Sequence, residues 1–332
     1  MKNKQKAALR LLAALLALTL LAPLGLTASA ADGPDTIYID SASDFVSFAK
    51  SCALDTWSAG KTVILRADIS LAGMDYTPVA AFGGTFDGGG HTITGLTITT
   101  KDQFVGLFGY LNRAGTVKNV VMEGVQITSN QIYGGSIGGV VGYSWGTIEN
   151  CSVSGSVSGT KCVGGVVGAQ IDGSITGCSS SATVKGMVDV GGVAGQTIFG
   201  ATLTACYATG NVTLEIDPKK NIAGGGLVGM NAGSSLLACY ATGNVTSTGS
   251  STGNVHIGGF LGDNYTTVTA CYWKNNHEQG IGYNNKVTGA TKVDGTDVTW
   301  QKAVATMNTA LQNAGSEWRY ELNGALPTLR KQ

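Results

Sequence analysis

The sequence predicts an all-β protein, a parallel β-helix with about six repeat coils and a short capping helix at each end. Two observations predict this fold. The nine-residue phrase ACYATGNVT occurs twice, at 205–213 and 238–246. A glycine-rich phrase also recurs, as VGLFG at Val105, GGVVG at Gly138 and Gly164, GGVAG at Gly191, GGLVG at Gly225 and GGFLG at Gly258. Such repetition is typical of a stacked solenoid.

The spacing of the repeats separates a constant part of each unit from a variable part. Each glycine phrase is followed after 13 to 15 residues by a cysteine, or by Val120 in the first copy. The interval from that residue to the next glycine phrase is 18, 13, 13, 19 and 19 residues. A fixed structural unit joined by loops of variable length explains both intervals.

Each repeat is expected to contain two or three short strands. In CYATGNV at 206–212, small or apolar residues alternate with polar ones, and a period of two indicates a strand. The glycine phrase supplies another short strand, and its glycines are expected at tight corners that need positive φ. One repeat cannot bury its apolar face alone, so the copies should stack with equivalent residues ~4.8 Å apart.

Five of the seven cysteines occupy one repeat position and are expected to form an inward-facing column. They are Cys151, Cys178, Cys206, Cys239 and Cys271, while Cys52 and Cys162 lie outside the column. Disulfides are the alternative in a secreted protein. Parallel side chains on adjacent coils are poorly placed for a disulfide, and buried cysteine serves well as a small apolar residue. A reduced, packed column is therefore favoured, and the absence of a CxxC pair argues against a metal site.

The start of the chain is predicted to be a secretory signal peptide, residues 1–30. Four basic residues precede an apolar run at 11–26, and Ala28-Ser29-Ala30 offers a cleavage site of small residues. No later segment is apolar enough to cross a membrane, so no membrane insertion is expected after cleavage. The mature protein is expected to be secreted, either extracellular or at the cell surface.

Three further segments follow the leader. An N-terminal cap and the first coils are expected over 31–103, with a helix at about 43–53 that begins after a capping pattern at Ser41 and Asp44. The repeat solenoid is expected over 104–276. A C-terminal cap is expected over 277–332, with an amphipathic helix at 299–312 and a closing segment at 318–329 that folds back on the last coil.

Composition limits the classes of partner. The chain has 21 Lys and Arg against 21 Asp and Glu, and removal of the leader leaves 17 against 21, a net charge of −4. A mildly acidic chain without a basic stripe argues against nucleic acid as a partner. Only 13% of residues are charged and 50 are glycine, as suits a surface of short strands and turns.

The repeated phrases resemble the GLUG motif of bacterial secreted and surface proteins. The resemblance rests on Gly-Gly-Leu-Val-Gly followed by Cys-Tyr-Ala-Thr-Gly-Asn-Val, on the 86–98 lead-in and on Leu-Pro-Thr-Leu at 326–329. Such repeats accompany the catalytic domain of M26-type IgA-cleaving metalloproteases and occur in adhesin-like proteins. The resemblance implies a right-handed parallel β-helix, a bacterial source and an extracellular, adhesion-type role. It implies no activity, because these repeats have no agreed catalytic residues.

Two kinds of enzyme were considered. A zinc protease needs His-Glu-x-x-His, and the single His-Glu pair, at His277, has Ile281 in place of the second histidine. A polysaccharide lyase or glycoside hydrolase needs carboxylates gathered on one face. The candidates do not share one repeat column; they are Glu123, Glu149, Asp172, Asp189, Glu215, Asp217 and Asp263. A non-catalytic protein without a cofactor is therefore predicted, with a lyase or hydrolase on the same scaffold as the alternative.

One column is a candidate binding surface. The residues directly after the repeat cysteine position are Val121, Ser152, Ser179, Tyr207, Tyr240 and Tyr272, and by period two they should face outward. The three tyrosines would then form an exposed aromatic column that could bind a glycan or a host or cell-surface protein. The alternative is a stacking ladder that only stiffens neighbouring strands.

Overall fold

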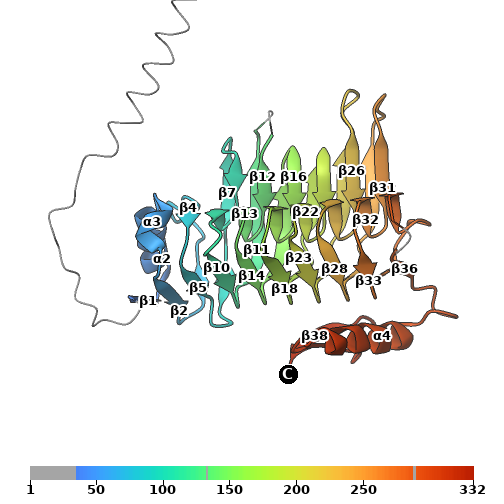
Figure 1. Ribbon diagram of the computed structural model, residues 1–332. Helices are drawn as coiled ribbons and strands as arrows, with labels where there is room; N and C mark the ends of the chain where they lie inside the picture. Colours follow the sequence, from blue (N-terminus) through green and yellow to red (C-terminus); the bar gives the residue numbers. More distant parts are fainter. Residues whose placement is uncertain (1–34, 132–133, 287–288) are drawn as a thin grey trace, which may run out of the picture. The chain divides into compact units, whose positions relative to one another are not determined.

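The computed structural model describes residues 35–131, 134–286 and 289–332, and the predicted leader lies outside them. Residues 36–332 form one compact unit, a parallel β-helix in which four sheets run along the axis (Figure 1). Eight strands of one sheet come from successive coils, so the helix has about eight turns and not six. The two additional coils lack the cysteine phrase by which the repeats were counted.

We name the sheets A to D. Sheet A contains β1 (Thr36–Ile39), β2 (Thr62–Leu65), β5 (Thr85–Asp87), β10 (Thr116–Lys118), β14 (Thr147–Glu149), β18 (Ser174–Thr176), β23 (Thr202–Thr204), β28 (Ser235–Leu237) and β33 (Val268–Thr269). Sheet B contains β3 (Ile69–Ser70), β6 (Thr92–Thr94), β7 (Thr97–Thr100), β11 (Val121–Ser129), β15 (Ser152–Ser158), β19 (Ser179–Ser180), β20 (Thr183–Gly186), β24 (Tyr207–Ala208), β25 (Val212–Glu215), β29 (Tyr240–Ala241), β30 (Val245–Thr248), β34 (Tyr272–Trp273) and β36 (Thr291–Lys292).

The other two sheets come from the glycine phrases and the residues around them. Sheet C contains β4 (Val79–Phe82), β9 (Phe108–Leu111), β13 (Val141–Ser144), β17 (Val167–Gln170), β22 (Ala194–Ile198), β27 (Val228–Ala232), β32 (Leu261–Asn264) and β35 (Ile281–Asn284). Sheet D contains β8 (Phe104–Val105), β12 (Ser136–Gly138), β16 (Lys161–Gly164), β21 (Val188–Gly191), β26 (Ile222–Gly225) and β31 (Val255–Gly258).

The register confirms that equivalent residues of successive coils lie directly above one another. Tyr207 pairs with Tyr240, and Tyr240 pairs with Tyr272. In sheet A, one inward position is aliphatic in six coils and at most 3% exposed; its residues are Val117, Ile148, Ile175, Leu203, Leu236 and Val268. Identical phrases therefore recur because each coil supplies the same inward side chains as its neighbour.

The five repeat cysteines lie inside the solenoid and are at most 1% exposed. The backbone N–H of Cys206 donates to Sγ of Cys239 over 3.4 Å, and Cys239 makes the same contact to Cys271. All seven cysteines are free thiols. Burial raises the pKa of Cys178 and Cys206 well above the usual thiol value, which lowers the thiolate fraction that reacts.

Thiol titration checks this arrangement. We expect seven free thiols in the denatured, unreduced protein, and very slow reaction of the folded protein at pH 8, because every thiol is buried. A count below five would show that the column is oxidised.

The glycine phrases serve a different purpose from the one predicted. Their glycines do not adopt positive φ. Instead, sheets C and D lie with their backbones almost in contact. A Cβ on Gly229 in β27 would overlap the backbone of Asp189 and Val190 in β21, and Gly195 is equally close to Cys162. The phrase therefore needs glycine because a side chain would not fit between the two sheets.

A ladder of polar side chains runs through the interior beneath sheet C. Thr197 donates to Asn231 over 3.0 Å, Asn231 to Asn264 over 2.8 Å, and Asn264 to Asn284 over 2.9 Å. The first three residues are fully buried. Each amide both donates and accepts, so the ladder satisfies groups that would otherwise be costly to bury.

Asn231→Leu is expected to lower the free energy of unfolding by about 2 kcal/mol, because it removes hydrogen bonds made by the buried side chains of Thr197 and Asn264. Urea denaturation measures the change. Thr213→Ala is the control, because it removes the surface hydrogen bond to Thr246 and should change little. Equal effects of the two variants would contradict a structural role for the ladder.

The N-terminal cap agrees with the prediction. Helix α2 (Ala42–Ser51) begins after Ser41, whose side chain accepts from the Asp44 N–H, and α3 (Asp55–Ser58) follows. Phe48 stacks on Phe86 with ring centroids 5.8 Å apart, so α2 covers the open end of the first coils.

The C-terminal segment forms the predicted helix but lies elsewhere. Helix α4 (Trp300–Asn313) is followed by an antiparallel pair, β37 (Trp318–Glu321) and β38 (Thr328–Lys331). The prediction that residues 318–329 fold back on the last coil is wrong, because Trp318 lies at Gly177 and the Tyr320 hydroxyl reaches Ala238. The segment runs along the side of the solenoid below β28 and β33 (Figure 1), and Lys331 reaches Glu149 in β14. Its buried aromatic side chains need an apolar surface, which the side of the solenoid provides.

No helix in the described part of the chain is long and apolar enough to cross a membrane.

Candidate functional site: a serine-lined groove on sheet B

The predicted tyrosine column exists, but two of its members are not exposed. Tyr207 and Tyr240 stack with ring centroids 4.9 Å apart and planes 4° apart. Tyr240 is 0% exposed and Tyr272 is 7% exposed, while Tyr207 is half-buried. The prediction that all three face solvent is therefore wrong. They point away from the solenoid interior, as period two requires, but the C-terminal segment covers them.

The C-terminal segment holds the tyrosines through specific contacts. The Tyr240 hydroxyl donates to the Pro327 carbonyl over 2.5 Å, and the ring meets Trp300 edge-on at 5.2 Å. The Tyr320 hydroxyl donates to the Ala238 carbonyl over 2.9 Å. Together with Met307 and Leu311 of α4, these side chains form a second hydrophobic cluster outside the solenoid.

The corner between sheets A and B shows why the segment fits there. One residue per coil adopts φ between 51° and 65° at this corner; the residues are Asn119, Asn150, Gly177, Ala205, Ala238 and Ala270. Asparagine and glycine suit positive φ, whereas alanine there is strained. The smaller residues begin where the C-terminal segment docks, and a Cβ on Gly177 would overlap the Trp318 ring. Small corner residues thus leave room for the segment.

The uncovered half of the same column forms a hollow that we name the serine groove. Its floor consists of small side chains on two central coils, and larger side chains bound it on both sides. The hollow measures about 250 Å³ and is lined on its outer face by Val121, Glu123, Ser152, Ser154, Ser179, Ser181, Tyr207 and Thr209. Serine between Glu123 and Tyr207 leaves the space, because a hydroxymethyl group is much shorter than either neighbour.

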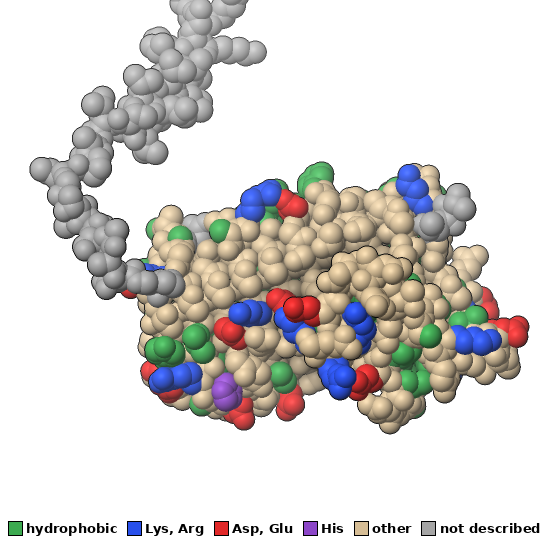
Figure 2. Space-filling model, turned by 60° about the horizontal axis from the view of Figure 1, so that its bottom comes forward, with side chains coloured by type: hydrophobic (Ala, Val, Ile, Leu, Met, Phe, Trp, Pro, Cys, Tyr) green, Lys and Arg blue, Asp and Glu red, His purple; other side chains and the backbone are tan. Residues whose placement is uncertain are grey.

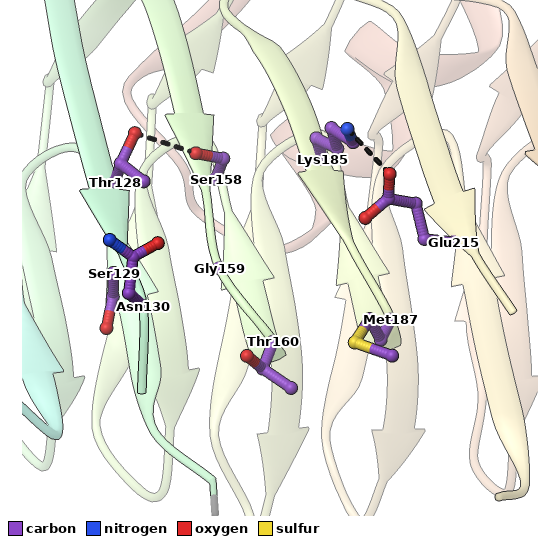
Figure 3. A pocket seen from close by; sticks show the side chains of 9 residues that line it. All are labelled: Thr128, Ser129, Asn130, Ser158, Gly159, Thr160, Lys185, Met187 and Glu215. Carbon is purple, nitrogen blue, oxygen red and sulfur yellow. Dashed lines mark hydrogen bonds and ion pairs between the residues drawn. The ribbon is translucent and has the colours of Figure 1, made fainter. Parts of the chain in front are cut away.

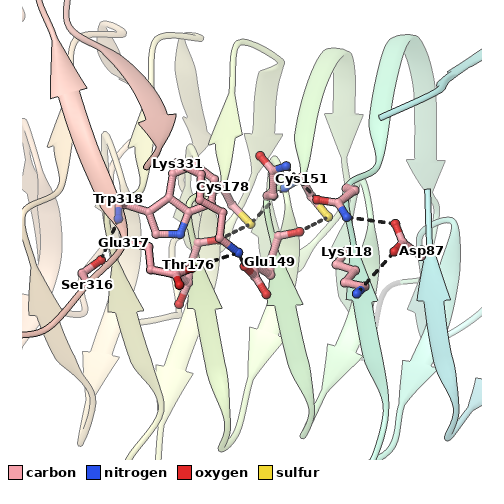
Figure 4. Close-up of polar contacts among 12 residues, drawn as sticks. Asp87, Lys118, Glu149, Cys151, Thr176, Cys178, Ser316, Glu317, Trp318 and Lys331 are labelled. Atoms are coloured by element: carbon pink, nitrogen blue, oxygen red, sulfur yellow. Dashed lines mark hydrogen bonds and ion pairs between the residues drawn. The ribbon is translucent and has the colours of Figure 1, made fainter. Parts of the chain in front are cut away.

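The edge of the C-terminal segment closes one end of the serine groove. A smaller hollow of about 140 Å³ continues from it, along Ser152 and Ser179, to Trp318 and Leu329. Figure 4 shows the contacts at this end. Lys331 pairs with Glu149 over 2.8 Å and with Glu317 over 3.3 Å, and the hydrogen bond that Lys331 donates to Glu149 raises the lysine pKa. The end wall therefore combines an aromatic ring with an ion-pair network.

A second hollow of about 370 Å³ lies at the far edge of sheet B. Figure 3 shows its lining, in which Thr128 and Ser158 share a hydrogen bond of 3.0 Å and Lys185 pairs with Glu215 over 2.7 Å. The hollow results from the unequal lengths of the loops that join successive strands. Only two residues join β15 to β16 and only Met187 joins β20 to β21, whereas six join β25 to β26. The two short loops form the floor of this hollow, and the longer loops of the neighbouring coils flank it.

The carboxylates considered for catalysis are mostly held in surface ion pairs. Asp172 pairs with Arg113, Glu149 with Lys331, Glu215 with Lys185 and Asp217 with Lys220. Repeat spacing did not predict that the charge of Asp263 acts on Asp189. Asp189 of sheet D and Asp263 of sheet C occupy different columns, but the two sheets lie back to back, and the charge of Asp263 contributes to raising the Asp189 pKa. No repeat period relates residues on two different sheets, so spacing alone could not show this proximity.

The face of the molecule drawn in Figure 2 has few charged side chains, and cations and anions are interspersed on it without a large patch of one sign.

Stacked parallel coils with a repeated inward cysteine define the class: a parallel β-helix repeat protein. Two of its repeats, residues 133–158 and 159–185, match the family model described as the GLUG motif. The chain is similar to halomucin of Haloquadratum walsbyi (strain DSM 16790 / HBSQ001), with 34% identity over 149 residues, which cover 41% of this chain. The chain spans 2% of the length of halomucin.

A solved structure shares the fold. It is a Bacteroides ovatus protein provisionally named an immunoglobulin A1 protease, with a TM-score of 0.66 and 20% sequence identity. The similarity covers 88% of this chain and 91% of that chain. At this sequence identity the similarity shows a common fold alone.

Proposed function

We propose that this chain is a non-catalytic extracellular or cell-surface protein of the adhesion type, and that its serine groove binds a glycan. One observation supports this most directly: the groove presents several hydroxyl side chains between two larger walls, with Tyr207 on one side and Trp318 at its end. Hydroxyl groups exchange hydrogen bonds with a sugar, and aromatic rings stack on its apolar face. The basic and apolar pattern of residues 1–30 and the name halomucin support the extracellular location.

The direction of the groove suits a polymer. It crosses four coils, from Val121 to Tyr207, so it runs along the solenoid axis and perpendicular to the strands. Equivalent hydroxyl groups then recur at the strand spacing of ~4.8 Å, which is close to the length of one sugar residue in an extended chain. Successive sugars could therefore make equivalent contacts with successive coils.

Ser179→Arg tests the proposal because a long side chain fills the floor of the groove. We expect glycan-array binding to fall by about tenfold or more. Ser156→Arg is the matched control, since Ser156 is exposed on the same outer face of sheet B but lines neither hollow. Equal binding by wild type and Ser179→Arg would overturn the assignment of the groove, and loss of binding in both variants would point to a general charge effect.

The non-catalytic part of the proposal has its own test. A glycan that binds on the array is incubated with the protein, and new reducing or unsaturated ends are measured. We expect none above background. Release of such ends, lost in Asp263→Asn, would instead support the alternative of a hydrolase or lyase that uses the carboxylates on sheets C and D.

A further inference from the structure

A second cluster of polar and aromatic side chains lies on sheets C and D, away from the serine groove on sheet B. We name it the carboxylate cluster; it consists of Asp189 in β21, His256 in β31, Asp263 in β32, Tyr265 directly after β32, and Tyr283 in β35. Strands β31 and β32 lie toward the end of the solenoid remote from α2 (Figure 1). The register places Asp263 beside Tyr283 on adjacent strands.

The aromatic side chains of the cluster form an accessible platform. Tyr265 is 37% exposed and Tyr283 is 40% exposed, and their ring centroids lie 5.7 Å apart with planes at 49°. His256 stacks on Tyr283 at 5.0 Å, and its Nδ1 contacts Asp263 Oδ1 over 2.5 Å. Histidine thus fixes one carboxylate next to the exposed ring.

The second carboxylate is buried without a strong partner. Asp189 is 6% exposed, and within the described part of the chain its carboxylate accepts a hydrogen bond only from the Cys162 thiol, over a long 3.9 Å. A thiol is a weak donor, so this contact compensates little of the cost of burying a charge. The backbone at Asp189 also has φ of 54°, which is unfavourable for aspartate relative to glycine.

Burial, and not the neighbouring charges, dominates the environment of Asp189. Burial is the main cause that raises its pKa to about 6; the charge of Lys161 lowers it, the charge of Asp263 raises it to a smaller extent, and the Cys162 thiol lowers it slightly. Burial also raises the pKa of Asp263, against the effect of His256. Burial raises the pKa of the Tyr265 hydroxyl, and the charges of Asp263 and, to a smaller extent, Asp189 raise it further. The cluster therefore holds two carboxylates whose burial His256 and Lys161 compensate only in part.

We propose that the carboxylate cluster binds an amino sugar, with the ring of the sugar against Tyr265 and Tyr283 and its ammonium group near Asp263 and Asp189. An ammonium group compensates the buried negative charge and is attracted to the face of a tyrosine ring. A pyranose ring offers an apolar face to the tyrosines. A metal ion fits less well, because the described residues contain no group of three or more His, Cys, Asp or Glu side chains placed to hold one.

Titration with glucosamine, observed by NMR on the full chain, tests this proposal. We expect saturable shifts of the Tyr265 and Tyr283 signals with glucosamine, and binding weaker by about tenfold or more with N-acetylglucosamine, which lacks the charge. Tyr283→Ala and Asp189→Asn should each lower the affinity for glucosamine by a similar factor. Binding should also weaken between pH 7 and pH 5, because protonation of Asp189 removes its negative charge.

Several results would overturn the proposal. They are equal binding of the two sugars, full binding by Asp189→Asn, and binding of lysine amide as tight as that of glucosamine, which would assign the site to ammonium groups of proteins. Tyr283 is at the exposed edge of sheet C, so Tyr283→Ala should fold even if a variant at Asp189 does not. Ser179→Arg leaves this cluster intact, so failure of the serine groove and failure of the carboxylate cluster can be told apart.

Discussion

Trp318→Ala is expected to release the C-terminal segment from the side of the solenoid and to lower its local stability by about 3–5 kcal/mol. Trp318 is 5% exposed, and its ring lies on Gly177 at the corner between sheets A and B. Removal of the indole leaves a cavity that the rigid coils cannot fill, and it weakens the adjacent contact of Tyr320 with Ala238. Hydrogen exchange of α4 and limited proteolysis of the segment measure the loss.

Trp57→Ala is the matched control for this prediction. Trp57 is 36% exposed beside the N-terminal cap, so its removal should change the stability of the C-terminal segment very little. Release of the segment should also expose Tyr240 and Tyr272, which are now covered, and change the near-ultraviolet circular dichroism. Unchanged exchange of α4 in Trp318→Ala would show that the segment is held chiefly by Tyr240 and Trp300.

Gly177→Asn examines the same interface from the solenoid side. Asparagine suits the positive φ of Gly177, as Asn119 and Asn150 do on the preceding coils. Without the C-terminal segment the substitution would be almost neutral, but in the folded protein its side chain would displace the Trp318 ring. We expect Gly177→Asn to release the segment without disturbing the solenoid, so protease should remove the segment and leave the coils intact.

The fold could be predicted from the sequence because a solenoid repeats its local environment. A cysteine at one inward position in five coils, with Val120 before it, shows both the length of the repeat and the side of the strand that faces the interior. The same period explains what could not be predicted. Stacking specifies neighbours along one column, but it says nothing about which surface a non-repeating segment such as α4 will cover.

The serine groove shows this limit clearly. The sequence placed Ser179 and Tyr240 in one outward column, and the structure confirms their register through Tyr207. It could not show that Tyr240 is covered and Ser179 is open. A signal was present in the corner residues, which change from Asn150 to Gly177 and then to alanine where the segment docks.

Asp189→Asn is expected to stabilise the protein by about 3 kcal/mol at pH 7 and to have little effect below pH 4. The reason is the direction of the pKa shift. Burial raises the pKa of Asp189 from its ordinary value of 3.8 to about 6 in the folded protein. The folded state therefore binds the proton more tightly than the unfolded state, and stability decreases as the pH rises from about 4 to above 6.

The pH dependence distinguishes this effect from a general improvement in packing. Asparagine cannot ionise, so the difference in the free energy of unfolding between variant and wild type should grow through this window and then level off. Any benefit of asparagine at φ of 54° does not depend on pH and should be visible already at pH 4. Urea denaturation at several pH values measures both contributions.

Asp172→Asn is the control for this experiment. Asp172 is at the surface, where a backbone hydrogen bond from Gly173 and the neighbouring Arg113 lower its pKa, so its replacement should not stabilise the protein at pH 7. A constant difference between Asp189→Asn and wild type from pH 4 to pH 8 would mean that Asp189 is not a buried, ionised group. A carboxylate that destabilises the fold at neutral pH, and whose replacement removes amino-sugar binding, would show that stability at this position is given up for recognition.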